Sequence, residues 1–258
     1  MENNRGISRN TLKFIAITTI VIGHFFLYTF TSLRLIRDFP VFWRGILCYI
    51  CFMGPPIFMF FIAEGFRYTS SKLRYGKRLL LFALITQVIF AITSKSGLGF
   101  DFKIFFFTWN VFFALFFGFL DLCILTSKQK TAWKMLEVLG TLALTFFTAT
   151  EWGVFGQLII IAYYYLREHR VLKFIVVSAL NYATFVCGDC LFGGNYQLSF
   201  WSKNMPYILA FGMIGIALVS FFYYGKNGKK NKFLQYFFYV FYPLHLLLID
   251  IVLLVANA

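Results

Sequence analysis

The sequence has 258 residues, of which 60% are hydrophobic and only 13% are charged. An ordinary soluble domain carries roughly 25% charged residues, so a water-soluble fold of this length could not cover its apolar surface. The 37 Phe and 15 Tyr residues make that surface bulky and aromatic, which a lipid bilayer tolerates around a helix. The composition therefore predicts an all-α integral membrane protein.

Nine apolar runs are predicted to be transmembrane helices, because a span needs roughly 20 apolar residues. In chain order they cover about residues 11–30, 44–64, 77–94, 104–126, 132–149, 152–166, 172–190, 206–224 and 233–256. No small-residue cleavage site follows the first run, so we interpret it as a retained span. Only the turn at 150–153 separates the fifth and sixth runs, and a re-entrant hairpin there would change the count.

Basic residues alternate with the predicted spans. One alternating set of hydrophilic segments contains 18 Lys and Arg residues and the other contains six. By the positive-inside rule, this asymmetry places the N-terminus in the cytoplasm and the C-terminus outside. The formal net charge of +14 is then explained by anionic lipid headgroups, so no nucleic-acid partner is predicted.

The chain shows no internal repeat and no linker, which predicts a single membrane domain over residues 1–258. Its five cysteines include two Cys-x-x-Cys pairs, Cys48 with Cys51 and Cys187 with Cys190. Because they lie mostly within apolar runs, we interpret them as small buried side chains. No metal site is predicted.

Two histidines fall within predicted spans, where ionisable groups tend to mark function. His24 lies in the outer half of the first span, and His245 follows Pro243 in the last span. A histidine can act as a general base near neutral pH, or it can simply form an interhelical hydrogen bond. His169 lies among charged residues in a loop and is predicted to be solvated.

Glu64 and Asn110 are further polar residues in apolar runs. Glu64 falls near the cytoplasmic interface, where it could line a cofactor vestibule or form a salt bridge to Arg67 or Arg74. Asn110 is predicted to face an interior cavity. Other polar residues of this kind could equally form helix–helix hydrogen bonds; they are Gln87, Asp121 and Gln157.

Five basic residues lie just before the third span, and we call them the basic cluster: Arg67, Lys72, Arg74, Lys77 and Arg78. Arg forks and Lys point charges bind phosphates, so the cluster could hold an anionic cofactor such as coenzyme A. The alternative is ordinary anchoring at the cytoplasmic interface.

Taken in order, several short blocks resemble the TraX family of membrane proteins. They cover nearly the whole chain: 12–16 (LKFIA) with His24, 56–58 (PIF), 62–69 (IAEGFRYT), 75–87 (YGKRLLLFALITQ), 110–112 (NVF), 151–156 (EWGVFG) and 241–246 (FYPLHL). The sequence departs from the family pattern at Gly23, where an Asp usually precedes the histidine, and at Glu151, which is often Asp. The loss of a carboxylate beside His24 means that another helix would have to orient the imidazole.

This resemblance implies an acetyltransferase in a bacterial cytoplasmic membrane, since the family's named member acetylates the N-terminal amine of pilin. The expected co-substrate is acetyl-CoA, and the expected acceptor is an amine of a pilin or exported peptide. In this scheme His24, His245 and Glu64 are the catalytic residues. The basic residues Arg67, Arg74, Lys77 and Arg78 would bind CoA phosphates, with Asn110 lining the channel.

Two other functions stay open. His24, Glu64 and His245 could form a proton relay in a transporter, although transporters are often built from internal repeats, which this chain lacks. A non-catalytic accessory of pilus or peptide export is the third possibility.

Overall fold

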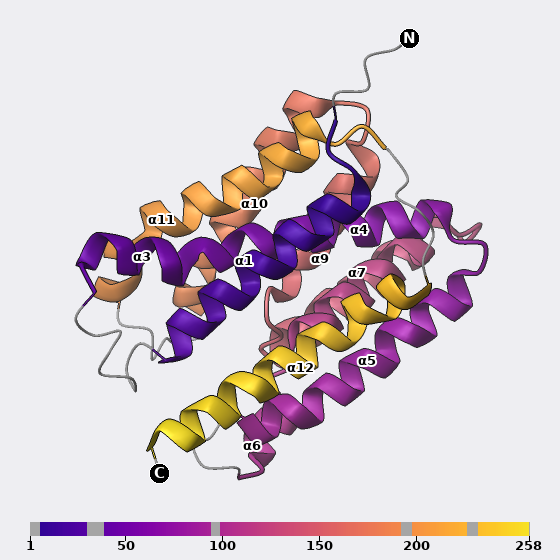
Figure 1. Ribbon diagram of the computed structural model, residues 1–258. Helices are drawn as coiled ribbons and strands as arrows, with labels where there is room; N and C mark the ends of the chain where they lie inside the picture. Colours follow the sequence, from indigo (N-terminus) through magenta and orange to yellow (C-terminus); the bar gives the residue numbers. More distant parts are fainter. Residues whose placement is uncertain (1–5, 30–38, 94–98, 192–197, 226–231, 258) are drawn as a thin grey trace. The chain divides into compact units, whose positions relative to one another are not determined.

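The computed structural model describes residues 6–29, 39–93, 99–191, 198–225 and 232–257 (Figure 1). Within these ranges the chain folds into helices and forms no strand, which confirms the predicted all-α class. The elements are α1 (Arg9–Thr29), α3 (Val41–Tyr49), η1 (Ile50–Met53), α4 (Gly54–Tyr68), α5 (Lys72–Thr93), α6 (Phe102–Phe107), α7 (Val111–Leu125), α8 (Thr131–Phe147), α9 (Gly153–Tyr165), α10 (Arg170–Leu191), α11 (Leu198–Ala217), η2 (Leu218–Phe222) and α12 (Lys232–Asn257).

Seven helical stretches within the described residues are long and apolar enough to cross a bilayer, and this makes the protein a multi-pass membrane protein. They are Arg9–Leu27, Phe42–Tyr68, Lys72–Thr93, Phe102–Leu125, Arg170–Cys187, Met205–Phe222 and Tyr236–Val255. Each coincides with one of the nine predicted spans. The second runs through α3, η1 and α4, and the fourth runs through α6 and α7.

The predicted fifth and sixth spans are the short helices α8, with 17 residues, and α9, with 13 residues. At 1.5 Å per residue they are about 25 Å and 20 Å long, less than the roughly 30 Å of a bilayer core. Exposed apolar side chains on α8, such as Trp133, Leu136 and Phe147, are suited to lipid. By length, these two helices are not independent spans.

Hydrogen bonds place the turn between α8 and α9 part of the way along α5. Lys72, the first residue of α5, lies 3.4 Å from Thr126 Oγ1 at the end of α7. At the other end of α7, Asn110 Nδ2 donates to Ala83 O at 3.0 Å, and the backbone of Trp109 pairs with Thr148 O at 3.1 Å. The turn between α8 and α9 is therefore level with Ala83, which is only about 16 Å from the start of α5. The whole of α5 is about 33 Å long.

This turn is buried, because Thr148 and Thr150 are less than a tenth exposed. Irregular backbone at membrane depth is tolerated only where protein covers it. The structure therefore favours a re-entrant hairpin for α8 and α9 over two full spans, and Glu151 lies in a buried turn instead of an outer loop.

The count of spans does not alter the predicted orientation. Seven and nine are both odd, so the termini stay on opposite sides. The basic residues before α8 and those after α9 also fall on the same side in either case, which leaves the 18-to-6 asymmetry unchanged.

Cysteine labelling from each side of the membrane tests this topology. We expect Lys130→Cys to react with an impermeant maleimide only from the cytoplasmic side, and Lys103→Cys only from the outside, since both side chains are exposed. A variant in which the native cysteines are replaced serves as the background. Labelling of both positions from one side would overturn the proposed orientation.

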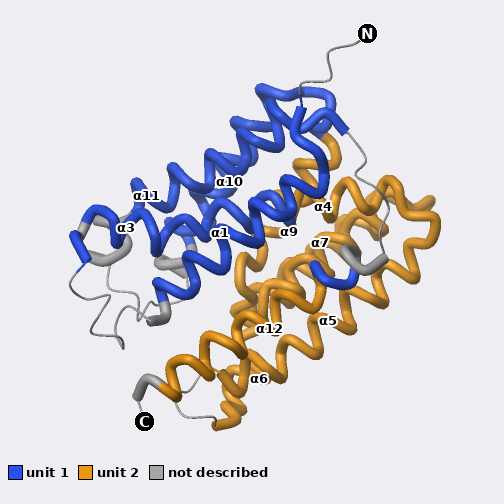
Figure 2. Tube along the Cα trace, in the orientation of Figure 1, with its two compact units in different colours: residues 1–58, 166–238 blue, residues 59–165, 239–258 orange. Residues whose placement is uncertain are grey.

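The chain divides into two compact units, with boundaries inside α4 and α12 (Figure 2). Unit 1 comprises Met1–Phe58 and Leu166–Phe238. Its helices approach closely at glycines: a side chain at Gly23 would collide with Cys51, and one at Gly215 would collide with the backbone of Met53. Close approach at small residues is the usual way in which helices pack in membranes.

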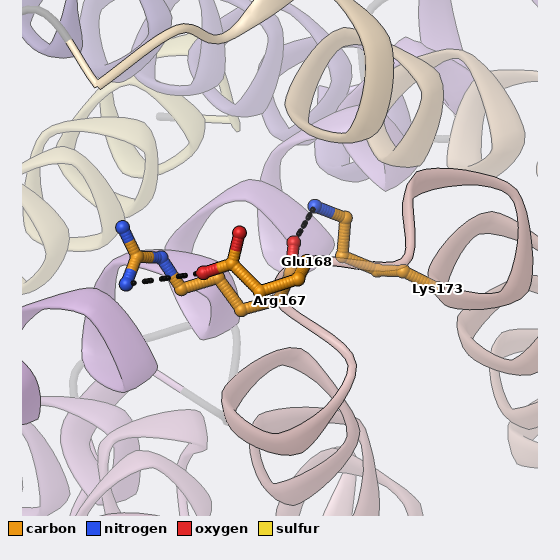
Figure 3. Close-up of polar contacts among 3 residues, drawn as sticks. All are labelled: Arg167, Glu168 and Lys173. Atoms are coloured by element: carbon orange, nitrogen blue, oxygen red, sulfur yellow. Dashed lines mark hydrogen bonds and ion pairs between the residues drawn. The ribbon is translucent and has the colours of Figure 1, made fainter.

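Charged side chains form a hydrogen bond and an ion pair in the turn before α10 in unit 1 (Figure 3). Lys173, which is buried, donates to the carbonyl of Arg167 at 3.3 Å, and Arg167 Nη1 lies 3.5 Å from Glu168 Oε1. A lysine that binds the last free carbonyls of a turn stabilises it. The neighbouring His169 is exposed, as predicted.

Unit 2 comprises Met59–Tyr165 and Tyr239–Ala258. Here α7 packs against α9, and a side chain at Gly118 would collide with Ile160. Gly65 of α4 lies against Tyr75 of α5 in the same way. Most of the candidate functional residues belong to this unit.

Candidate functional site

Asn110 lies at the centre of a buried polar network in unit 2 and is fully inaccessible to solvent. As the N-cap of α7 it accepts from Phe112 N at 3.0 Å, the usual role of an Asn at this position. Its Nδ2 donates to Ala83 O at 3.0 Å and to Gln87 Oε1 at 2.8 Å. The amide is therefore fully used in joining α5 to α7.

Gln87 completes this connection from α5. Its Oε1 also accepts from the backbone of Asn110 at 3.0 Å. Its Nε2 lies within 3.2 Å of three carbonyl oxygens around the end of α6, those of Ile104, Phe105 and Thr108. The Gln87 side chain thus supplies hydrogen-bond partners to the irregular backbone between α6 and α7. Backbone polar groups in the interior of a membrane protein require such partners.

Glu151 lies in the turn between α8 and α9, which has an unusual backbone. Ala149 and Trp152 have positive φ angles of 40° and 62°, which are rare for residues with side chains. The backbone of Glu151 donates to Trp109 O at 2.8 Å, and the Thr148 and Thr150 hydroxyls pair at 2.9 Å. Strained turns fixed in this way cluster at functional sites.

The Glu151 carboxylate joins two further elements. Its Oε2 accepts from Val111 N at 3.0 Å, in the first turn of α7, and from the Tyr242 hydroxyl of α12 at 3.2 Å. A carboxylate at a helix N-terminus is also favoured by the helix dipole.

His245 lies one turn beyond Tyr242 on α12 and is buried. Its Nδ1 is 3.2 Å from Phe241 O, and its ring stacks on that of Phe241. A carbonyl can only accept, so Nδ1 carries the proton and Nε2 of the neutral ring holds the lone pair. The centroids of the Tyr242 and His245 rings are 5.2 Å apart, so His245 contacts the residue whose hydroxyl donates to Glu151.

Aromatic rings lie around the hydrogen bond between Tyr242 and Glu151. We call them the aromatic cluster: Phe82, Phe112, Tyr239 and Tyr242. The Phe112 and Tyr242 rings meet edge to face at 5.5 Å. Tyr239 stacks on Phe82 at 5.0 Å and lies 6.4 Å from Phe112. The cluster therefore draws together helices α5, α7 and α12 beside Glu151.

The basic cluster lies around the N-terminal end of α5, with Arg67 at the end of α4. Four of its side chains are exposed and that of Arg78 is partly buried. Arg74, Lys77 and Arg78 are spaced three and four residues apart and so share one face of α5. Lys72 lies over the Phe66 ring at 4.0 Å and approaches Thr126 at the end of α7.

A family profile described as "TraX protein" matches residues 8–253. The chain belongs to the TraX family. It is also similar to a "Probable fimbrial assembly protein FimC, serogroup H1" of Dichelobacter nodosus, with 27% identity over 255 residues, 96% of this chain and 97% of that protein. No solved structure matches the chain.

Within unit 2, the predicted site residue Glu64 of this TraX protein lies apart from the hydrogen bonds of Glu151. Glu64 is one turn before Arg67 on α4, at the same end of unit 2 as the basic cluster. His24 is partly buried on α1 and belongs to unit 1. Within unit 2 the structure thus groups Asn110 with His245 at one level and Glu64 with the basic cluster at another.

The site of this TraX protein contains three residues that were not predicted as site residues: Gln87, Glu151 and Tyr242. All three lie inside sequence blocks that resemble the family, and Gln87 is also a polar residue within an apolar run. Their partners cannot be found from local spacing, because Tyr242 is 91 residues from Glu151.

Proposed function

We propose that this TraX protein is an acetyltransferase that acts within a membrane system for pilus or peptide export. The observation that supports it most directly is the grouping of His245, Tyr242 and Glu151 at the start of α7. A nitrogen base and a carboxylate both contact Tyr242 about halfway along the transmembrane helices, where such groups are costly unless they have a function.

The chemistry requires a base because an ammonium group has no lone pair with which to attack a thioester. The Nε2 atom of His245 accepts a proton from the acceptor ammonium, and the amine nitrogen then attacks the acetyl carbonyl carbon. The carbon–sulfur bond breaks, and the CoA thiolate leaves and takes up a proton. His24 stays a second candidate for the base, and Glu64 a candidate for the cytoplasmic entrance.

Acetyl-CoA is the proposed donor, and the basic cluster is its proposed phosphate site. From Arg74 to Gln87 along α5 is about 20 Å. The pantetheine arm of CoA is the part of the donor that would extend over this distance. Asn110, which is fully hydrogen-bonded, would then position α7 beside the arm instead of binding CoA directly.

Charge reversal on one face of α5 tests the donor site. We expect Arg74→Glu combined with Arg78→Glu to raise KM for acetyl-CoA at least tenfold with a smaller effect on kcat, because phosphate binding is lost while the reacting groups stay in place. The control is Lys103→Glu at the far end of unit 2. An unchanged KM in the double variant would refute the assignment.

The acceptor is proposed to be the amine of a pilin or another exported peptide. The family and the name of the Dichelobacter relative support this class. Mass spectrometry of exported proteins from cells with and without the gene should show peptides whose mass differs by one acetyl group. Identical acetylation in both would contradict the proposal.

A polar series inside the α7–α9 group keeps transport as a second candidate. Asp121 accepts from the Thr141 hydroxyl at 2.6 Å, and Gln157 donates to Thr145 at 2.6 Å. The other Asp121 oxygen has no hydrogen-bond partner among the described residues. A pH-driven flux in proteoliposomes that lack acetyl-CoA, and that Asp121→Asn abolishes, would favour this function.

A further inference from the structure

Glu151 uses one carboxylate oxygen in the fold and leaves the other available. Both of its hydrogen bonds, from Val111 N and from the Tyr242 hydroxyl, end on Oε2. In the part of the chain that the structure describes, no hydrogen bond reaches Oε1, and the residue is only partly buried. A polar ligand can therefore reach Oε1 without breaking the contacts that hold the turn.

No basic side chain of the described residues forms an ion pair with Glu151. The basic cluster is at the N-terminal end of α5, whereas the turn that contains Glu151 is about halfway along this helix. A partly buried carboxylate without a counter-ion is costly, so the ionised form is suited to a ligand that brings a positive charge.

The rings next to Glu151 favour the same kind of ligand. The ring centroids of Tyr242 and Phe112 are 5.5 Å apart, and the Tyr242 hydroxyl donates a hydrogen bond to Glu151. Aromatic faces attract ammonium groups, most strongly where water is excluded. A carboxylate combined with aromatic rings discriminates a cation from a neutral alcohol of the same size.

We infer that Glu151, with the rings of Tyr242 and Phe112, binds the ammonium group of the acceptor. This inference rests on the proposed function and specifies its substrate class as a protonated primary amine. Glu151 Oε1 accepts an N–H bond from the ammonium, and His245 on the next turn of α12 is the group that takes the proton. Glu151 is thus a binding residue that orients the amine before transfer.

Ligand binding in the absence of any donor tests the inference. The probes are n-butylammonium chloride and n-butanol, added to the full-length protein in detergent without acetyl-CoA, with sodium chloride to match ionic strength. We expect butylammonium to raise Tm in a saturable way and butanol at equal concentration to have no such effect. Linkage then gives a Kd from the dependence of Tm on concentration.

Glu151→Gln removes the charge but keeps an oxygen that can accept from Val111 and Tyr242. We expect its Kd for butylammonium to rise at least tenfold while its Tm without ligand stays close to that of the wild type. The matched control is Glu137→Gln, because Glu137 is exposed on α8 and should leave the Kd unchanged. Tyr242→Phe keeps the ring and should weaken binding less than Glu151→Gln.

The inference is overturned if butylammonium fails to shift Tm of the wild type, if butanol shifts it equally, or if Glu151→Gln binds as tightly as the wild type. A different result would refute the proposed function while leaving the inference in place. Butylammonium binding that depends on Glu151, in a protein that transfers no acetyl group to any amine, would support the ammonium site and refute the acetyltransferase.

Discussion

His245→Gln is expected to lower the rate of acetyl transfer about 10²- to 10⁴-fold, the usual contribution of a positioned general base. Gln retains a polar side chain of similar length on α12 but cannot accept a proton near neutral pH. The loss should appear in kcat, with KM for acetyl-CoA little changed, because the basic cluster is untouched. Transfer of labelled acetyl groups to a peptide amine measures it.

His169→Gln is the matched control, since His169 is exposed in a loop and should transfer acetyl groups normally. His24→Gln separates the two candidate bases. If His24→Gln loses activity while His245→Gln retains it, the base lies on α1 and the role assigned to α12 is wrong. Full activity in both variants would exclude histidine catalysis altogether.

Asn110→Ala is expected to lower the free energy of unfolding by about 2 to 3 kcal/mol. The substitution removes the cap on Phe112 N and the bonds to Ala83 O and Gln87 Oε1, and each hydrogen bond contributes about 1 kcal/mol. Denaturant unfolding in detergent micelles, followed by tryptophan fluorescence, measures the change.

Asn110→Ser provides the matched comparison for this prediction. Serine is a good N-cap, so it should restore the bond to Phe112 N but not the two bonds made by Nδ2. We expect its stability to lie between those of Asn110→Ala and the wild type. A change below about 0.5 kcal/mol for Asn110→Ala would show that the network does not stabilise α7.

The sequence was sufficient to predict the membrane class and seven of the spans, because long apolar runs report directly on burial in lipid. The hairpin of α8 and α9 was less accessible to prediction. Its two helices are apolar like true spans, and what distinguishes them is the turn at 148–153, whose partners on α7 are about 40 residues away. Hydropathy carries no information about such pairing.

The candidate site was predictable to a similar extent. Asn110 and His245, which the sequence places in apolar runs, are buried in the structure, and four of the five residues of the basic cluster are exposed. The predicted interior cavity at Asn110 is instead a filled hydrogen-bond network. The pairing of Glu151 with Tyr242 depends on how α12 packs against α7, which no spacing within the chain encodes.

The buried turn of the hairpin has a consequence for biogenesis. Its backbone pairs with that of Trp109, and its Glu151 carboxylate accepts from Val111 N, so a hairpin inserted alone would leave polar groups facing lipid. During synthesis α5, α6 and α7 leave the ribosome first and can already be in the bilayer when the hairpin arrives. Tyr242 follows Glu151 by 91 residues, so the carboxylate acquires its second hydrogen bond only after α12 has been synthesised.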